Sequence, residues 1–99
     1  MYIGILKVKL RLPENQTLKG KRQAIKAIKP IIARVQNRFN VSIAEVEDLD
    51  LWQIATLGIT CVSNSTPFCN ETLSKVVDFI AQSPHETELL DYEIELLTV

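Results

Sequence analysis

Hydrophobic and polar side chains alternate along residues 2–12, the first patterned segment of the chain. Four aliphatic positions share one parity, namely Leu6, Val8, Leu10 and Leu12. The basic positions between them share the other parity, namely Lys7, Lys9 and Arg11. A period of two predicts a β-strand with one buried face and one charged, open face.

A helical period follows the loop PENQT, with Thr17 as a candidate N-cap. Its apolar positions are separated by seven, three, four, three and four residues, namely Leu18, Ile25, Ile28, Ile32, Val35 and Phe39. These steps form one stripe along a helix. Pro30 lies inside this stretch, and a proline there removes the hydrogen bond to the Lys26 carbonyl at a cost of about 3 kcal/mol. We expect a kink near residues 26–30, or two helical pieces.

Two further strands are predicted in the middle of the chain. In residues 40–46 the pattern does not decide which face of the strand is buried, because Val41 and Ile43 have one parity and Ala44 and Val46 the other. A β-bulge would reconcile the two parities. Residues 52–63 alternate clearly. Their predicted buried positions are Ala55, Leu57, Ile59 and Cys61.

A second helix and a last strand complete the pattern. Thr66 as N-cap with Pro67 in the first helical position is a helix start signal. The helix stripe consists of Cys69, Leu73, Val76 and Ile80. Residues 88–98 then predict a strand. Its inward positions are Leu90, Tyr92, Ile94 and Leu96, and its outward positions are Asp91, Glu93 and Glu95.

The order β-α-β-β-α-β predicts a ferredoxin-like α+β sandwich, a single domain over residues 1–99. Right-handed crossovers place the strands in the order 4-1-3-2 in an antiparallel four-stranded sheet, with two helices on one face. The basic first strand and the acidic last strand then become neighbours. One register pairs opposite charges, as Lys7 with Glu95, Lys9 with Glu93, and Arg11 with Asp91.

Composition and charge limit the class of protein and the compartment in which we expect it. With 99 residues, 46% hydrophobic and 23% charged, the chain has no apolar run long enough for a transmembrane helix. Two cysteines and an N-terminus without a signal-peptide pattern predict a cytoplasmic protein. The net charge of −1 conceals an asymmetry. Residues 1–38 contain ten Lys or Arg and one acid, whereas residues 39–99 contain one Lys and eleven acids.

The basic helix is the main candidate site, because residues 17–38 contain seven basic side chains and no acid. Five of them form a candidate phosphate-binding surface: Lys19, Lys21, Arg22, Lys26 and Lys29. Such a surface would bind RNA with a strong salt dependence. The alternative is an ordinary solvated helix face. Attachment to an anionic membrane is less favoured, because the core needs the apolar stripe.

The open face of the sheet offers a second kind of surface. No aromatic residue lies on the open face of the first strand, so the sheet lacks the stacking platform typical of RNA-binding sheets. Trp52, with Asp48 and Asp50 in the acidic turn, is a candidate protein-interaction site. Separately, five apolar residues could gather as a patch on the open face of the sheet, namely Ile3, Ile5, Ile54, Val62 and Leu97. Such a patch would suggest a homodimer formed through the two sheets. The alternative is that these residues are scattered apolar surface, which is normal for a folded protein.

Catalysis finds little support in the sequence. His85 is the only histidine, and Cys61 and Cys69 lack metal-ligand spacing. Cys69 could carry a stabilised thiolate in the first turn of a helix, or it could be a small buried residue. The acidic turn lacks the spacing of a calcium loop, and no glycine-rich phosphate loop is present. We therefore expect no enzyme activity, cofactor, metal or small-molecule substrate.

Several segments together resemble the YlxP-like family of small bacterial proteins of unknown function. They are MYIGIL, TLKGKR (17–22), NRFNVSIAEV (37–46), DLWQIATLGI (50–59), VSN and LLDYEIELL (89–97). The resemblance covers nearly the whole chain and implies a ferredoxin-like fold. Through its gene neighbourhoods it also implies a role in ribosome assembly or translation, with ribosomal RNA or a ribosomal subunit as partner. No catalytic residues are carried over. The rival hypothesis is a protein-interaction module or homodimer, and a weaker third is a small enzyme using Cys69 or the acidic turn.

Overall fold

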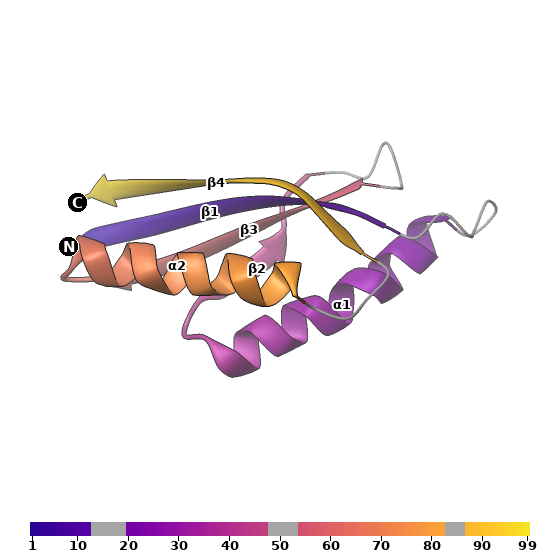
Figure 1. Ribbon diagram of the computed structural model, residues 1–99, viewed down its shortest axis with the longest axis horizontal. Coiled ribbons are helices and arrows are strands. Elements are labelled where there is room, and N and C mark those ends of the chain that lie inside the picture. The colour runs from indigo at the N-terminus through magenta and orange to yellow at the C-terminus, as the bar shows by residue number, and fades with distance from the viewer. Residues whose placement is uncertain (13–19, 48–53, 83–86) are drawn as a thin grey trace.

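The computed structural model describes residues 1–12, 20–47, 54–82 and 87–99, with side chains at all of these positions except 20–27. The elements are β1 (Tyr2–Arg11), α1 (Gly20–Arg38), β2 (Ser42–Glu45), β3 (Ile54–Ser63), α2 (Thr66–Ala81) and β4 (Glu88–Thr98). The strands form one antiparallel sheet in the order β2-β3-β1-β4. Both helices lie on the same face of it (Figure 1). This is the predicted ferredoxin-like arrangement.

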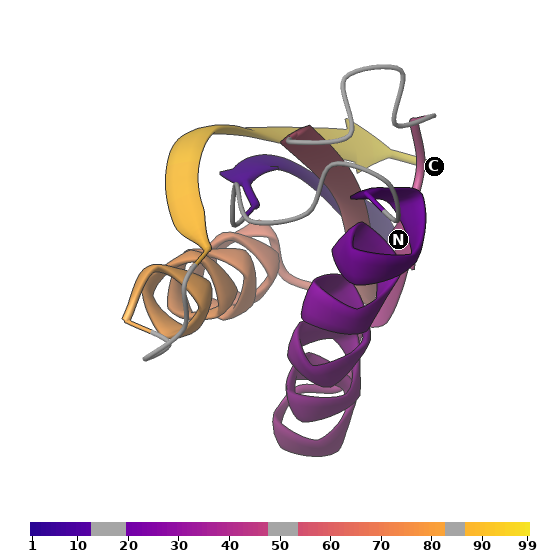
Figure 2. The ribbon, with the colours of Figure 1, turned by 90° about the vertical axis from the view of Figure 1, so that its right-hand side faces the viewer.

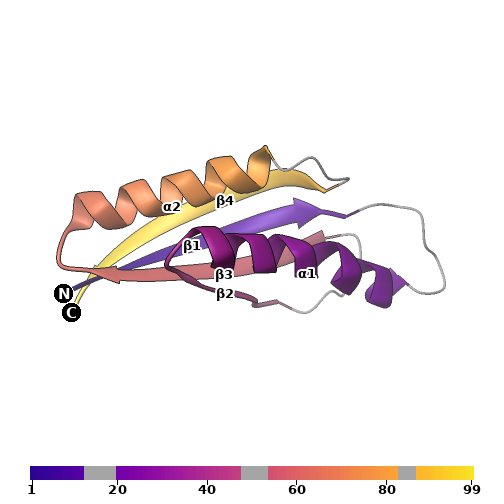
Figure 3. The ribbon, with the colours of Figure 1, turned by 90° about the horizontal axis from the view of Figure 1, so that it is seen from below.

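The hydrophobic core lies between the sheet and the two helices. Seen from the helix side, α2 runs along β4 and β1, and α1 runs along β3 and β2 (Figure 3). The fully buried large side chains include those predicted from the strand alternation, namely Leu6, Val8, Leu10, Leu57 and Ile59. One face of the sheet therefore packs on the helices, and the other is left open.

The two chain ends lie side by side at one end of the sheet (Figure 1). The Met1 amino group donates a hydrogen bond to the Val99 carbonyl at 2.8 Å. The Val99 amide donates to the Met1 carbonyl, also at 2.8 Å. These bonds extend the pairing of β1 with β4 to the ends of the chain.

The predicted register between β1 and β4 is wrong by two residues at Lys7 and Lys9, and by three at Arg11. Lys7 lies opposite Glu93, Lys9 opposite Asp91, and Arg11 opposite Glu88. A bulge separates the pairs of Lys9 and Leu10, and Leu89 rather than Leu90 is the partner of Leu10. A shift by two residues keeps every side chain on its face, so alternation alone could not exclude it. The first residues of β4 curve toward the end of α2 (Figure 2), as a bulge favours.

Helix α1 runs without interruption through Pro30, so the expectation of two helical pieces is wrong. Its described buried positions are Ile28, Ile31 and Val35, while Ile32, predicted in the stripe, is only partly buried. The predicted cap Thr17 and the apolar Leu18 lie outside the described residues.

The structure also corrects the predicted N-cap of α2 and decides which face of the short strand β2 is buried. Ser65, not Thr66, is the N-cap, and its hydroxyl accepts a hydrogen bond from the Phe68 amide at 3.3 Å. In β2, Ile43 is buried toward the helices. Val46 lies past the end of the strand, half exposed and beside Gly58. The buried face is therefore that of Ile43 and the partly buried Val41, whereas Ala44 and Val46 are exposed.

Candidate functional surfaces

The outer face of α1 is the best-defined basic surface of the helix. Arg22, Lys26 and Lys29 are spaced by four and three residues, so their positions share one face of the helix. The buried positions Ile28 and Val35 belong to the opposite, sheet-facing side. The stripe of three basic positions therefore faces away from the core.

Of the other two predicted phosphate contacts, Lys21 is spaced differently along the helix. Lys21 precedes Ile28 by seven residues, so its position falls on the side of the helix that faces the sheet. Lys19 lies outside the described residues. Three of the five predicted positions thus share one face of α1 by their spacing, and the place of Lys19 stays a prediction.

The side chain of Lys29 is exposed. Among the described residues, the ion pairs join Lys7 with Glu47, Arg11 with Glu88 and Lys75 with Glu71, and none involves Lys29. The far end of α1 is different. There the Arg38 guanidinium lies 5.3 Å from the centre of the Phe79 ring and 6.0 Å from that of Phe39. Arg38 is thus engaged with the aromatic pair that joins the two helices.

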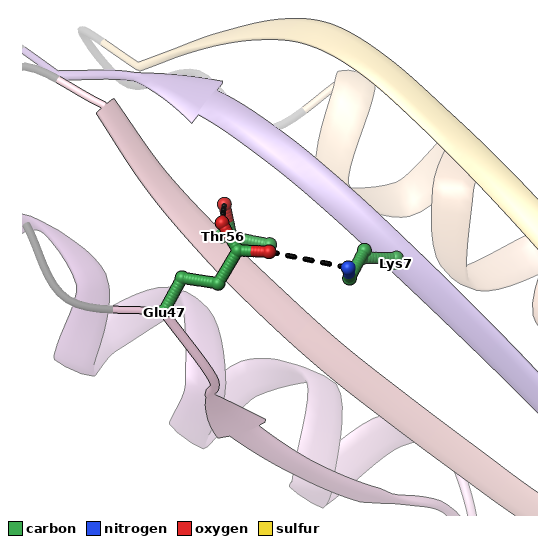
Figure 4. A network of polar contacts seen from close by, with 3 residues as sticks. All are labelled: Lys7, Glu47 and Thr56. Atoms are coloured by element: carbon green, nitrogen blue, oxygen red, sulfur yellow. Dashed lines mark hydrogen bonds and ion pairs between the residues drawn. The ribbon is translucent and has the colours of Figure 1, made fainter.

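The basic residues of β1 are matched by acids on the open face of the sheet. Lys7 Nζ lies 3.1 Å from Glu47 Oε1, and the Thr56 hydroxyl donates to Glu47 Oε2 at 3.4 Å (Figure 4). The hydrogen bond from Lys7, and then its positive charge, hold the pKa of Glu47 below its ordinary value of 4.5. Arg11 lies 3.6 Å from Glu88. These cations are already paired within the fold.

Gly58 leaves space on the open face between Glu47 and Lys7. It lies opposite Lys7 on the neighbouring strand, and a Cβ atom there would lie 2.7 Å from Val46 Cγ1. The side chain of Glu47 can therefore extend over β3 to reach Lys7 of β1 (Figure 4). A small hollow of about 210 Å³ next to this cluster is lined by Lys7, Lys9, Glu47, Asp91, Tyr92 and Glu93. Its three acids outnumber its two cations, so it is a poor site for a phosphate.

An apolar patch occupies the other end of the open face. Ile3 lies between Val62 of β3 and Leu97 of β4, and the exposed fractions of the two flanking side chains are 63% and 39%. A shallow apolar hollow of about 370 Å³ continues past Ile5. Ile54 lies opposite Arg11 at the charged end, so its predicted place in the patch is wrong.

The remaining candidates are either buried or outside the described residues. Trp52, Asp48, Asp50 and His85 fall in segments that the structure does not describe. Cys61 and Cys69 are free and buried. Burial, and then a hydrogen bond with Cys69, raise the pKa of Cys61 to about 11. Cys61 is therefore a packing residue rather than a reactive thiol.

Within residues 1–12, 20–47, 54–82 and 87–99, no group of three or more His, Cys, Asp or Glu side chains is arranged to hold a metal ion. In the same part of the chain, neither helix combines the length and the apolar character needed to cross a bilayer.

Comparisons with known proteins place the chain among uncharacterised relatives. Residues 3–94 match the model of a family described as "Protein of unknown function (DUF503)". The uncharacterized protein YlxP of Bacillus subtilis (strain 168) is 38% identical over 82 residues, which cover 83% of this chain and 86% of that protein.

Solved structures with a similar fold are more distant. The de novo designed protein Foldit4 is 12% identical with a TM-score of 0.46, and the match covers 98% of each chain. A protein of unknown function from Bacteroides thetaiotaomicron, described as a possible oxidoreductase, is 16% identical with a TM-score of 0.46. That match covers 96% of this chain and 95% of the other.

Proposed function

The chain belongs to the DUF503 family of proteins of unknown function, and we propose that it is a non-catalytic accessory factor that binds ribosomal RNA or a ribosomal particle. The contact is made by the outer face of α1, at Arg22, Lys26 and Lys29. The protein acts in ribosome assembly or translation, in the cytoplasm.

The observation that carries this proposal is the difference between the two groups of basic residues. On β1, Lys7 and Arg11 lie within 4 Å of acids of the same sheet. On α1, the helix itself contains no acid from Gly20 to Arg38, and Lys29 has no ion pair among the described residues. Lys29 is therefore available to an external anion, whereas Lys7 and Arg11 already have partners among the described residues.

The spacing of the three positions suits a contact with a phosphate backbone. Arg22 and Lys29 are separated by seven residues, or about 10 Å along the helix axis. Lysine and arginine bind phosphates and release the counterions condensed on a nucleic acid, so affinity falls as salt is raised. The charge cluster around Lys7, in which three acids outnumber two cations, offers no comparable attraction.

The experiment is co-sedimentation with small ribosomal subunits at increasing salt. We compare the wild type with Arg22→Glu/Lys26→Glu and with Lys29→Glu. Lys75→Glu is the matched control, because it reverses one exposed helix lysine that already pairs with Glu71. We expect sedimentation that decreases steeply with salt, is lost in the double variant, is weakened in Lys29→Glu and is unchanged in Lys75→Glu.

Two results would contradict the proposal. Equal losses in Lys29→Glu and Lys75→Glu would show that only net charge matters. Absence of sedimentation by the wild type at low salt would show that the helix charges form a solvated face.

The apolar patch favours a second candidate function, a homodimer that acts as a protein-interaction module. Ile3, Val62 and Leu97 expose apolar surface at one end of the open face, and such patches commonly mark interfaces. Sedimentation velocity over a range of protein concentrations tests this. A dimer that Val62→Lys dissociates would support this function, and a monomer at all concentrations would refute it.

Catalysis is not part of the proposal, and the buried Cys61 supports its exclusion. Its raised pKa keeps the thiol protonated at neutral pH. We expect neither thiol of the folded protein to react selectively with a mild alkylating agent.

A further inference from the structure

The outer edge of β4 is an open sheet edge. In the strand order β2-β3-β1-β4, β4 is the last strand and pairs with β1 on one side only (Figure 1). It is 11 residues long and contains no proline, and its bulge lies near its beginning, beside Leu90. The remainder of its outer edge presents backbone N–H and C=O groups that a further strand could pair with.

The open face of β4 carries negative charge that the sheet does not fully neutralise. Asp91, Glu93 and Glu95 follow one another at alternate, exposed positions. Glu93 lies opposite Lys7, but the Lys7 amine pairs with Glu47 instead. Glu95 lies opposite the uncharged Ile5. Among the described residues, no cation lies within ion-pair distance of Glu93 or Glu95.

The helix-side face of β4 is apolar and incompletely covered. Tyr92 and Leu96 lie opposite Val8 and Gly4, on the face that packs against the helices. Their exposed fractions are nevertheless 49% and 39%. The outer edge therefore combines an acidic row on one face with an apolar row on the other.

We propose that this edge binds an extended segment of a partner protein in which Lys or Arg alternates with aliphatic residues. The segment adds a fifth strand beside β4. Its backbone pairs with the free edge, its cations lie beside Glu93 and Glu95, and its aliphatic side chains cover Tyr92 and Leu96. This surface is separate from the outer face of α1.

Strand β1 of the protein itself has the sequence pattern that we propose for such a ligand. β1 carries Lys7 and Lys9 on the open face and the buried Val8 and Leu10 on the other, and it pairs with β4 along the opposite edge. One strand of this pattern is thus already paired with β4 along its other edge. A second copy of β4 fits less well, because pairing that keeps both open faces on one side sets acids opposite acids.

The binding experiment uses a fluorescent peptide with the sequence of residues 5–12, ILKVKLRL, and measures its anisotropy with the full-length protein. Two further peptides separate backbone pairing from charge. One is N-methylated at alternate residues, which blocks strand pairing on one edge and keeps all charges. The other replaces its three basic residues by Glu. We expect the first peptide to bind and to shift β4 amide resonances, and both modified peptides to bind at least about tenfold more weakly.

Protein variants test the acidic row. We expect Glu93→Lys/Glu95→Lys to weaken peptide binding by about tenfold or more, if each charge contact contributes about 1 kcal/mol. Glu45→Lys/Glu71→Lys is the matched control, because it makes the same change in net charge at exposed positions of β2 and α2. We expect this control to bind the peptide within about twofold of the wild type.

Several results would overturn the proposal. Equal binding of the N-methylated and unmodified peptides would mean general electrostatic attraction without strand addition. Amide shifts confined to residues outside β4 would place the peptide elsewhere. Failure of the unmodified peptide to bind the wild type at low salt would refute the edge as a docking site, whatever the result with ribosomal subunits.

Discussion

Two glycines allow side chains of other elements to lie directly against the sheet. A Cβ at Gly4 would lie 2.8 Å from Leu73 Cδ1 and 3.1 Å from Cys61 Sγ, inside the core. At Gly58, a Cβ would meet only Val46 closely, and that side chain is 52% exposed. The first contact is with packed neighbours, and the second is with a side chain that can move into solvent.

We predict that Gly4→Ala lowers the free energy of unfolding by about 1–3 kcal/mol, the usual cost of overpacking a filled core. Gly58→Ala should cost less, because Val46 can shift and because alanine restricts the unfolded chain. Urea denaturation followed by circular dichroism measures both. Equal losses in the two variants would show that the Gly4 site relaxes as freely as the Gly58 site.

The pair between Lys7 and Glu47 gives a second prediction at the residue scale. Because the pKa of Glu47 is lowered in the folded protein, the pair stabilises the fold above pH 4.5, and this contribution is lost as the pH falls through the lowered pKa. We expect Lys7→Ala to raise the pKa of Glu47 toward its ordinary value in an NMR titration. Lys75→Ala, which removes a lysine on α2, should leave it unchanged.

The buried thiol of Cys61 predicts sensitivity at high pH. Its pKa rises from 9.0 to about 11 because burial, and then Cys69, disfavour the thiolate. The thiol therefore leaves stability unchanged below pH 9, and stability decreases as the pH rises from 9 toward 11. We expect this decrease to reach about 3 kcal/mol at most. Denaturation of Cys61→Ala over the same pH range should show a smaller slope. Parallel slopes would assign the decrease to other groups.

At the scale of single elements, α1 tolerates a proline in its interior. Pro30 is exposed and has no amide hydrogen, so the Lys26 carbonyl lacks its usual helical donor. The helix continues through this site because Ile28, Ile31 and Val35 are buried against the sheet. Tertiary packing thus outweighs the local preference.

We expect Pro30→Ala to stabilise the protein by about 1–3 kcal/mol, since it restores a helical hydrogen bond and removes a steric conflict. Urea denaturation provides the measurement. Ala33→Gly, at another exposed position of α1, serves as a control of opposite sign and should cost about 1 kcal/mol. A loss of stability in Pro30→Ala would mean that restriction of the unfolded chain by proline dominates.

At the scale of the whole molecule, added salt should weaken the binding to ribosomal subunits and leave the stability of the fold nearly unchanged. The described ion pairs join side chains that are about half exposed, such as Lys7 with Glu47 and Arg11 with Glu88. Pairs of this kind contribute little to stability, because water and salt screen them. We therefore expect the urea midpoint to change little between low and moderate salt, while association with ribosomal subunits is lost over the same range. A parallel loss of both would indicate unfolding rather than release of counterions.

The predicted phosphate-binding surface shows which features of a binding site can be predicted from sequence spacing. Helical spacing alone places Arg22, Lys26 and Lys29 on one face, and it also sets Lys21 apart. Spacing could not show that the cations of β1 are already paired. Lys7 meets Glu47, which is 40 positions away in the sequence and comes from the end of β2, and no local pattern contains that contact.

The sequence by itself determined the elements, their order and the buried face of most strands, because periods of two and of 3.6 depend only on neighbouring residues. Only the tertiary structure decided the register of β4, its bulge, and which charges remain free. A register shift of two residues preserves every face, and the partner of a charged side chain depends on distances across the assembled sheet. For this reason the acidic row on the free edge of β4 could be proposed as a binding surface only once the fold was known.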